Sequence, residues 1–352
     1  MNRIVILGGG YGGLKIAHQL LSNTDRETSI TLIDRNPYHS MKTEFYALAA
    51  GTIAEKDVRT SFPEDERLHF IADEILHINI EHQSVMLRHT EKVYYDYLII
   101  GLGSEDNFHG IDGASEYTHK ISTIKKTRQT YEAVNNMKNY GTATIVGGGL
   151  SGVEMASELR ESRPDINIRL LDRGDSILKS FPEKIQEHAI EWFQEHDVEL
   201  VYQSKVDYVE PNILCNAGTC LLSDVTIWTA GIKPSKVVDK LDLEKDNAGR
   251  IILNDYHQVP EHPNIFVTGD CASLYLPPSA QLAEQQGKQI ADILTDILRG
   301  KDPKKPSKIV IKGTLGSLGK DDGFGLTLNY PLKGVLPRVI KTGVLWYHKF
   351  QN

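Results

Sequence analysis

The strongest constraint on the fold is a unit of about 30 residues that occurs twice in the chain. In the first copy, the run Arg3 to Leu7, rich in β-branched residues, leads into the turn Gly8 to Gly13, and a run with helical periodicity follows. The next apolar run closes on Asp34. The second copy repeats this order around the turn Gly147 to Gly152 and closes on Asp172. Strand, turn, helix and strand in this order predict a parallel βαβ unit.

Both turns have the spacing GxGxxG, which suits a nucleotide pyrophosphate. The first glycine makes the tight turn, the second lets a phosphate approach the backbone, and the third lets the helix pack on the strand. The helix N-terminus offers free N–H groups, and the following acid can accept the ribose hydroxyls. One such turn is weak evidence, but two complete copies predict two dinucleotide sites. They consist of Gly8, Gly10, Gly13 and Asp34 in the first unit, and Gly147, Gly149, Gly152 and Asp172 in the second.

The acid of the second unit bears on which nicotinamide nucleotide binds there. Asp172 would repel a 2′-phosphate, and this favours NADH over NADPH. Arg173 follows it directly, and an arginine at this place can accommodate the phosphate, so NADPH stays open.

Further strand patterns indicate that the second unit is inserted into the first domain. Residues 94–104 form a strand with a glycine turn, and a loop between Gly110 and Gly113 then crosses to the second unit. After that unit a strand ends at Asp270, and a helix capped by Ser279 runs to about Leu298. We therefore predict an α/β fold with two Rossmann-like dinucleotide-binding domains. Residues 1–112 and 248–330 form the first domain, 113–247 the second, and 331–352 a C-terminal amphipathic segment.

Length, charge and cysteine content agree with a two-domain protein that binds no nucleic acid. A chain of 352 residues can bury two cores, and a formal charge of −8 argues against a nucleic-acid partner. From Lys301 onward, in contrast, nine Lys and one Arg face three Asp, which suggests an anionic surface as partner. The N-terminus shows no signal-peptide pattern, so we expect a cytoplasmic location or the cytoplasmic side of the cell membrane, with the three cysteines reduced.

The order of the motifs resembles that of a known flavoprotein family. GGGYGG, YDYLIIGLGS, GGGLSGVE, WTAGIKP, FVTGDCA and LPPSAQLAEQQGK are similar to the motifs of the type II NADH:quinone oxidoreductases. The first four are shared by many flavin reductases, whereas GVE together with AQLAEQQG is typical of the quinone-reducing branch. The resemblance implies that FAD binds at the first turn, that NADH reduces it from the second, and that a quinone accepts the electrons.

The resemblance also implies roles for individual residues. Asp270 would bind the ribityl side of FAD, and helix N–H groups at Ala280 and Gln281 would stabilise negative charge on the flavin pyrimidine edge. Glu154 would relay protons near the nicotinamide, and Gln285, with the glutamine after it, would line the quinone pocket. The cofactor contacts implied in full are Gly8, Gly10, Tyr11, Gly12, Gly13, Asp34, Arg35, Lys42, Ile75, Gly269, Asp270, Ala280 and Gln281 for FAD, and Gly147, Gly149, Leu150, Gly152, Asp172, Ala230 and Gly231 for the nicotinamide nucleotide.

Several polar residues also have an ordinary structural interpretation. Glu154 could form a salt bridge on its helix, and the glutamine pair could lie on a solvated helix face. Cys215 and Cys220 flank a predicted hairpin turn, where we expect two unpaired thiols, and Cys271 is expected only to pack. No CxxxxC follows the first turn, as it does in disulfide reductases, and sulfide-oxidising relatives, which need cysteine beside the flavin, are also disfavoured. No metal-ligand spacing is evident, so no metal site is predicted.

The resemblance ends in the C-terminal segment. Members of the family usually end in a pair of amphipathic helices, whereas only Val335 to Asn352 remains here. Val339, Gly343, Trp346 and Phe350 share one helical stripe bordered by basic residues, which is typical of an interfacial helix. We expect weak peripheral contact with the inner face of the cell membrane. Docking on the protein's own core, or on the second subunit of a homodimer, is the alternative.

Three functions are open at this point. The leading hypothesis is a ping-pong reaction from NADH through FAD to a quinone of the menaquinone or ubiquinone type, without proton pumping. The alternatives are an NAD(P)H-dependent flavin reductase of a small redox protein and a flavin-based redox sensor with little turnover.

Overall fold

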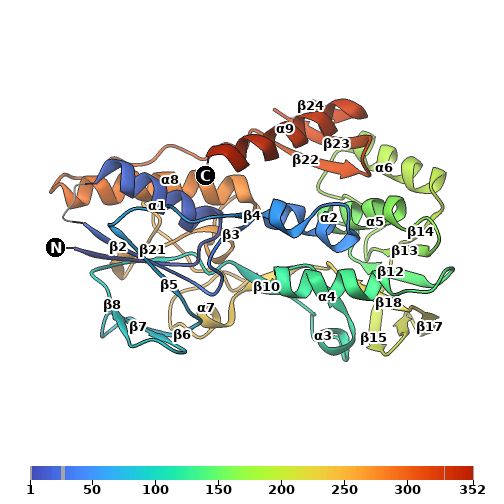
Figure 1. Cartoon of the computed structure of the whole chain (residues 1–352), viewed down its shortest axis with the longest axis horizontal. Coiled ribbons are helices and arrows are strands. Elements are labelled where there is room, and N and C mark those ends of the chain that lie inside the picture. The colour runs from blue at the N-terminus through green and yellow to red at the C-terminus, as the bar shows by residue number, and fades with distance from the viewer. Residues whose placement is uncertain (1, 25–27, 329, 352) are drawn as a thin grey trace.

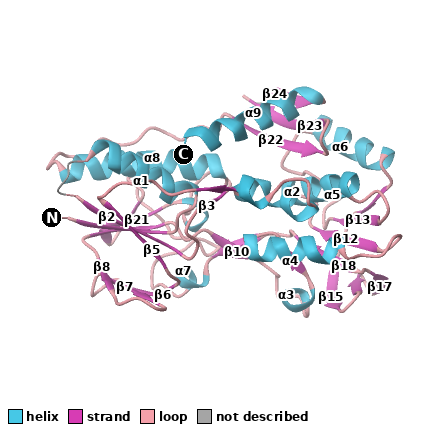
Figure 2. Ribbon diagram, viewed as in Figure 1, coloured by secondary structure: helices cyan, strands magenta, loops and turns pink. Residues whose placement is uncertain are grey.

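The computed structural model describes residues 2–24, 28–328 and 330–351, with the backbone only for residues 345–351. Two mainly parallel sheets, each with helices, lie next to each other along the long axis of the molecule (Figures 1 and 2). The predicted α/β class with two Rossmann-like sheets is confirmed.

The first sheet has its strands in an order that brings distant parts of the chain together. In space it contains β20 (Gln258–Val259), β21 (His262–Val267), β9 (Tyr97–Ile100), β1 (Arg3–Leu7), β2 (Ser29–Asp34) and β5 (Leu68–Ala72). Neighbours are parallel except for β20 and β21. Alternate side chains of β1 point to opposite faces. Ile4 and Ile6 share a core with α1 (Tyr11–Asn23) and α8 (Ala280–Leu298), whereas Val5 and Leu7 pack with a small antiparallel sheet. That small sheet consists of β6 (Ile75–Asn79), β7 (Ser84–Leu87) and β8 (Val93–Tyr94).

Helices α1 and α8 lie side by side over the first sheet (Figure 1). Two glycines permit their close approach, because a Cβ on Gly287 would lie only 2.7 Å from the carbonyl oxygen of Gly12. Gly12 also packs against the side chain of Thr268 at the end of β21. The turn before α1 and the segment between β21 and α8 therefore meet at one edge of the sheet.

The second sheet is built from strands that lie between those of the first in the chain, as expected for an inserted domain. It contains β11 (His119–Lys120), β18 (Val225–Trp228), β12 (Thr142–Val146), β13 (Asn167–Leu171) and β14 (Val198–Val201), all parallel. Helices α4 (Ile124–Asn135), α5 (Leu150–Ser162) and α6 (Glu183–Glu195) accompany it, together with the antiparallel strands β15 (Val206–Glu210), β16 (Ile213–Asn216) and β17 (Thr219–Leu222). The predicted domain limits stay a prediction.

Short strands and short helices lie in the connections between these larger elements. Between the two sheets, β10 (Ser104–Asp106) pairs with β19 (Ile232–Pro234) in antiparallel orientation. The others are β3 (His39–Ser40), η1 (Lys42–Glu44), α2 (Phe45–Ala50), η2 (Glu55–Val58), β4 (Arg59–Thr60), α3 (Ala114–Tyr117), α7 (Lys236–Asp239) and η3 (Gly269–Cys271).

The expectation of unpaired thiols at Cys215 and Cys220 is wrong. The two residues lie directly opposite each other in the β16–β17 hairpin and form a disulfide. The sequence pattern predicted the hairpin, but only the strand register decides which side chains face each other. Cys271 is free and packs as expected: its Sγ donates to the carbonyl oxygen of Gly103, and burial raises the pKa of its thiol to about 12.

The C-terminal region contains an antiparallel sheet that the sequence did not predict, followed by a helix over the predicted amphipathic segment. An antiparallel sheet of β22 (Gly313–Leu318), β23 (Asp322–Thr327) and β24 (Tyr330–Lys333) precedes α9 (Val335–Gln351). This sheet packs against α5 and α6 of the second domain (Figure 1). One side of α9 lies on β22 and β23, whereas Val335, Leu336, Val339 and Val344 are exposed. The side chains of Trp346 and Phe350, part of the predicted stripe, lie outside the described residues. Within the described part of the chain, no helix is both long and apolar enough to cross a membrane.

Candidate functional site

The first glycine turn joins β1 to α1, and the backbone at its middle glycine, Gly10, is open to a ligand. Gly8 has a φ of +97°, in the left-handed region that favours glycine. A Cβ on Gly13 would clash with the carbonyl group of Gly8, so the start of the helix lies against the turn. Apart from Gly10 itself and its two chain neighbours, no described atom lies within 4 Å of the place that a Cβ on Gly10 would take. The backbone at Gly10 is therefore open to a ligand at the N-terminus of α1, as a pyrophosphate requires.

The second glycine turn, between β12 and α5, repeats this construction. Gly147 has a φ of +111°, and a Cβ on Gly152 would clash with the carbonyl group of Gly147. Around Gly149, too, the described atoms leave the Cβ position free to 4 Å. The open glycines have nearly the same backbone, with φ −72° and ψ −173° at Gly10 and φ −76° and ψ −174° at Gly149.

The predicted acid of the first unit is fixed by backbone donors. Asp34 ends β2, and its Oδ2 accepts a hydrogen bond from the N–H of Gly9 at 2.8 Å. Its Oδ1 accepts from the N–H of Asn36, also at 2.8 Å. Oδ1 also accepts from Nδ2 of Asn36 at 3.4 Å, whereas Oδ2 keeps a further lone pair for a ribose hydroxyl. Arg35, which follows it, is exposed.

The predicted acid of the second unit has the same arrangement. Asp172 follows β13 and accepts hydrogen bonds from the N–H groups of Gly148 and Gly174, both at 2.7 Å. Arg173 is exposed, as Arg35 is in the first unit. Each site thus has its own copy of the same elements: the glycines of the turn, an acid after them, and an exposed arginine that follows the acid.

Asp270 lies in η3, beside the start of α8. Its Oδ2 accepts a hydrogen bond from Oγ of Ser104 at 2.6 Å. The side chain of Gln286 holds the same turn: it accepts from the N–H of Gly269 and donates to the carbonyl oxygen of Val267, both at 2.9 Å. Gln286 is fully buried, so it serves as a support of this turn.

The start of α8 forms hydrogen bonds with the segment that precedes β22. Ser279 caps the helix through its Oγ. Oε1 of Gln281 accepts from the N–H of Lys312 at 2.7 Å, and Nε2 of Gln285 donates to the carbonyl oxygen of Val310 at 3.0 Å. These glutamines therefore tie the predicted flavin edge to the segment that leads into β22.

The 3₁₀ turn η1 lies against the first glycine turn. The hydroxyl groups of Tyr11 and Thr43 are 3.1 Å apart, and burial raises the pKa of Tyr11 to about 12. Nζ of Lys42 lies 3.6 Å from the place that a Cβ on Gly103 would take, next to Ser104. The structure thus brings Lys42, the first turn and the Asp270 region together.

Four other predicted contacts lie elsewhere in the structure. Ala230 and Gly231 follow β18 and border the second turn, because a Cβ on Gly147 would lie 2.9 Å from Cα of Ala230. Leu150 opens α5 in that turn. Ile75 begins β6, where it packs against the core of the first domain.

A buried cluster of charged side chains lies where α2, α5, β22 and α9 meet. Lys341 of α9 is 7% exposed and forms an ion pair with Glu154 of α5. Its Nζ also donates to the hydroxyl groups of Tyr46, at 2.7 Å, and Ser317, at 3.1 Å. The N–H of Ser317 donates to Oε1 of Glu154 at 3.1 Å. Burial alone would lower the pKa of Lys341, but the attraction of its partners, Glu154 first, raises it. The sequence indicates a role for Glu154 and gives no sign of its partners.

Glu44, the last residue of η1, is a second carboxyl group of this cluster. It is 5% exposed, and its Oε1 lies 3.9 Å from Nζ of Lys341. Among the described residues this oxygen has no hydrogen-bond partner. Burial, which Lys341 offsets only in part, raises the pKa of Glu44 to about 7. The residue next to it, Thr43, contacts the first turn, so Glu44 lies close to the predicted flavin site.

We expect the free energy of unfolding to fall as the pH rises from about 4.5 to about 7. Over this window the folded protein binds the proton of Glu44 and the unfolded chain releases it, so stability falls with pH. One such group contributes at most about 3 kcal/mol. Denaturant titrations across this pH range would measure the decline. Glu44→Gln should flatten it, and Glu191→Gln, at an exposed position of α6, should not. An unchanged slope in Glu44→Gln would assign the decline to other groups.

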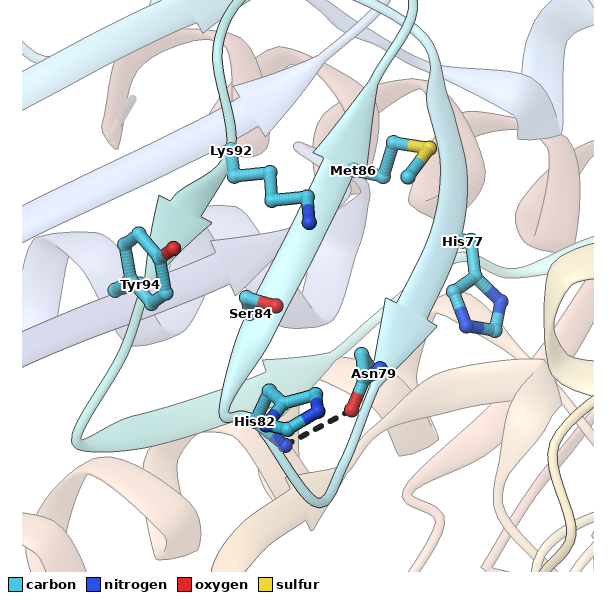
Figure 3. Close-up of a pocket in the computed structure, with 7 residues that line it drawn as sticks. All are labelled: His77, Asn79, His82, Ser84, Met86, Lys92 and Tyr94. Carbon is cyan, nitrogen blue, oxygen red and sulfur yellow. Dashed lines mark hydrogen bonds between the residues drawn. The ribbon is translucent and has the colours of Figure 1, made fainter.

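A separate hollow of about 230 Å³ lies on the small sheet β6–β8 (Figure 3). Its lining consists of His77, Asn79, His82, Ser84, Met86, Lys92 and Tyr94, and includes no predicted cofactor or catalytic residue. Among the described residues, no group of three or more His, Cys, Asp or Glu side chains is arranged to hold a metal ion.

Comparisons with curated proteins cover the whole chain. The NADH dehydrogenase-like protein YutJ of Bacillus subtilis is 48% identical over 354 residues, with 100% of both chains covered. The type II NADH:quinone oxidoreductase of Staphylococcus aureus is 26% identical, with 94% of this chain and 91% of the relative covered.

Solved structures share the fold over nearly the full length. NDH2 from Plasmodium falciparum in complex with NADH has a TM-score of 0.87 at 19% identity, covering 99% of this chain and 96% of that one. The sulfide:quinone oxidoreductase of Aquifex aeolicus has a TM-score of 0.84 at 20% identity, covering 99% and 90%. The sequence profile of the family described as pyridine nucleotide-disulphide oxidoreductase matches residues 2–287, which include both glycine turns, Asp270 and the start of α8. The chain therefore belongs to the pyridine nucleotide-disulphide oxidoreductase family.

Proposed function

We propose that this protein is an FAD-dependent NADH dehydrogenase that passes electrons to a quinone. The observation that carries the proposal is the pair of equally built glycine turns, each with one open glycine and one fixed acid. The name of the Bacillus subtilis relative supports NADH as the donor, and the name of the Staphylococcus aureus relative supports a quinone as the acceptor.

The residues of the first site fit FAD. Gly10 leaves room for the pyrophosphate, Oδ2 of Asp34 has a lone pair for the ribose, and Asp270 is held by Ser104 for the ribityl chain. The N-terminus of α8, after Ser279, would face the pyrimidine edge and stabilise negative charge there. When bound, FAD supplies the hydride acceptor and electron donor that no side chain provides.

The second site fits the nicotinamide nucleotide, with a preference for NADH. Two backbone N–H groups hold the carboxylate of Asp172, so a 2′-phosphate at the ribose would meet a fixed negative charge. Arg173 is exposed beside it, and an arginine at this place can accommodate a 2′-phosphate, which is the argument for NADPH. Gly149 leaves the space that the pyrophosphate needs.

The buried ion pair supports the quinone step. Glu154 lies two residues after Gly152, in the first turns of α5, so the pair is close to the second nucleotide site. Quinone reduction consumes protons as well as electrons. Nζ of Lys341 is a proton donor held in position by Tyr46 and Ser317, and Oε1 of Glu154 would return a proton to it.

The exposed side of α9 supports peripheral membrane contact. Val335, Leu336, Val339 and Val344 form an apolar surface on the helix that also carries Lys341. Quinones dissolve in the membrane, so a helix lying on the inner face of the membrane would bring their head groups near this site. A homodimer would be another way to cover the same side of the helix.

Stopped-flow measurements on the FAD-replete protein test this function. We expect NADH to reduce the flavin at least about tenfold more efficiently than NADPH, because of Asp172. Menadione or a ubiquinone analogue should then reoxidise it far faster than it reoxidises free flavin. Quinone turnover no faster than with free flavin would contradict the proposal. Reoxidation by a small redox protein would favour the reductase alternative, and a long-lived reduced complex that quinone does not discharge would favour the sensor.

A further inference from the structure

Helix α5 carries three glutamates on one face. Glu154, Glu158 and Glu161 are spaced four and three residues apart, so each lies about one helical turn from the next. Glu154 is 5% exposed and Glu158 is 4% exposed, whereas Glu161 is only half-buried. The helix packs against α2 and β22 (Figure 1). The row therefore runs from the buried cluster around Lys341 toward the surface.

The middle of the row is a buried carboxylate that the quinone step described so far does not use. Oε1 of Glu158 accepts a hydrogen bond from the hydroxyl group of Thr52, just after α2. Its Oε2 is buried and, in the described part of the chain, has no hydrogen-bond partner. A buried carboxylate oxygen without a hydrogen-bond partner costs folding free energy. Its presence therefore indicates a function or the transient binding of a proton.

The outer end of the row opens at the turn between β22 and β23. Oε2 of Glu161 accepts a hydrogen bond from the N–H of Lys320 at 2.8 Å, and Gly319 lies against its carboxyl group. Burial raises the pKa of Glu161, and the nearby charge of Glu158 adds to this effect. A group at this place can take a proton from water and hold it.

The charges around the row favour a bound proton. Glu44, Glu154 and Glu158 are all buried, and the cations facing them are Lys341, which is buried, and Arg338, which is half-buried. Like charges in a poorly hydrated space disfavour full ionisation, and burial raises the pKa of Glu44 and of Glu154.

The proposed reaction needs one proton from solvent in each turnover. NADH gives up a hydride, which is one proton and two electrons, whereas a quinone takes up two electrons and two protons to become a quinol. One O–H bond of the quinol must therefore form with a proton that enters from water. A relay for this proton rests on the proposed quinone function.

We propose that Glu161 and Glu158 relay this proton from the surface to the Glu154–Lys341 pair. A proton from water binds the carboxylate of Glu161, passes to Glu158, whose Oε1 accepts a hydrogen bond from Thr52, and then to Glu154. Side chains at these spacings have Cβ atoms about 5–6 Å apart, a gap that one water or one rotamer change closes. Glu154 in turn replaces the proton that Nζ of Lys341 donates to the quinone.

The experiment compares Glu158→Gln with Glu191→Gln, a matched change on exposed α6. Two acceptors are used: menadione, which takes protons with its electrons, and ferricyanide, which takes electrons only. We expect Glu158→Gln to lower NADH:menadione turnover at least about tenfold, with a larger loss at high pH and a larger solvent isotope effect. Flavin reduction by NADH and ferricyanide turnover should stay at the wild-type level. Glu158→Asp, which keeps a carboxyl group, should recover part of the menadione rate.

A second readout uses the protein without turnover. The infrared band of protonated carboxyl groups, followed between about pH 4 and about pH 8, should lose a component in Glu161→Gln and not in Glu191→Gln. Equal menadione rates and equal pH profiles in wild type and Glu158→Gln would overturn the relay and leave the quinone function intact. Wild-type protein that reduces ferricyanide and not menadione would overturn both. If Glu158→Gln loses its flavin, Glu161→Gln at the half-buried end takes its place with the same expectations.

Discussion

Gly10→Val is expected to weaken flavin binding strongly while the protein stays folded. Gly10 has a φ of −72°, which any residue adopts, and the described atoms leave 4 Å free around its Cβ position. A valine side chain is therefore accepted by the protein, but it fills the space in which a pyrophosphate would meet the backbone. We expect flavin affinity to fall at least about 100-fold, or about 3 kcal/mol. Flavin content of the purified variant and its thermal unfolding curve after flavin removal measure the two parts.

Gly149→Val is the matched change in the second turn, because its backbone is almost the same. This variant should keep its flavin and lose the reduction of that flavin by NADH. Gly13→Ala provides the contrast, since its Cβ would clash with the carbonyl group of Gly8 and should destabilise the folded protein itself. If Gly149→Val lost the flavin and Gly10→Val kept it, the assignment of the two nucleotides to the two turns would be reversed.

The repeated unit could be predicted because its signals are local. Each strand, glycine turn and acid lies within a short stretch, and the physical demand on each glycine belongs to one position of the backbone. The hydrogen bonds from Gly9 to Asp34 and from Gly148 to Asp172 realise this pattern in both sheets. The inserted order also follows from sequence, because strand patterns resume after the second unit.

The buried cluster could not be predicted in the same way. Lys341 and Glu154 are 187 positions apart, and nothing near either residue indicates the other. In the sequence, Lys341 counts as one more basic residue of an amphipathic helix, and the helix pattern does not decide which side faces inward. The same applies to β22–β24, whose alternation is interrupted by glycines at positions 313, 316, 323 and 325. These strands exist because they pack against α5 and α6.

The cysteine pair shows a different limit. Cys215 and Cys220 have a spacing that both a hairpin with free thiols and a hairpin with a bridge would allow. Only the register, in which these two positions face each other across the strands, decides between them. The glutamine pair shows the same limit. Its position on the helix does not decide whether the side chain of Gln286 faces solvent or the backbone N–H of Gly269.

Lys341→Met is expected to lower the free energy of unfolding by about 3 kcal/mol at about pH 8. Methionine keeps much of the length of the lysine side chain, but it leaves Glu154 buried without its cation and removes the nearest positive charge from Glu44. At about pH 5 the loss should be smaller, because the stranded carboxyl groups then take up protons. Lys320→Met, at an exposed position of the β22–β23 turn, should change stability by less than about 0.5 kcal/mol. Denaturant titrations at both pH values give the comparison.

The double variant Lys341→Met/Glu154→Gln separates the loss of a contact from the burial of an unpaired charge. The amide side chain introduced in place of Glu154 would keep an acceptor for the N–H of Ser317 and carry no charge, so most of the lost stability should return. Menadione turnover should stay low in this variant, because both proton-exchanging groups are gone, whereas ferricyanide turnover should persist. Suppose that Lys341→Met is as stable as wild type and that the double variant shows no recovery. Lys341 would then not hold α9 against α5. The side of α9 that carries Lys341 would then be free to face solvent. The assignment of a buried charged side and an exposed apolar side to this helix would be wrong.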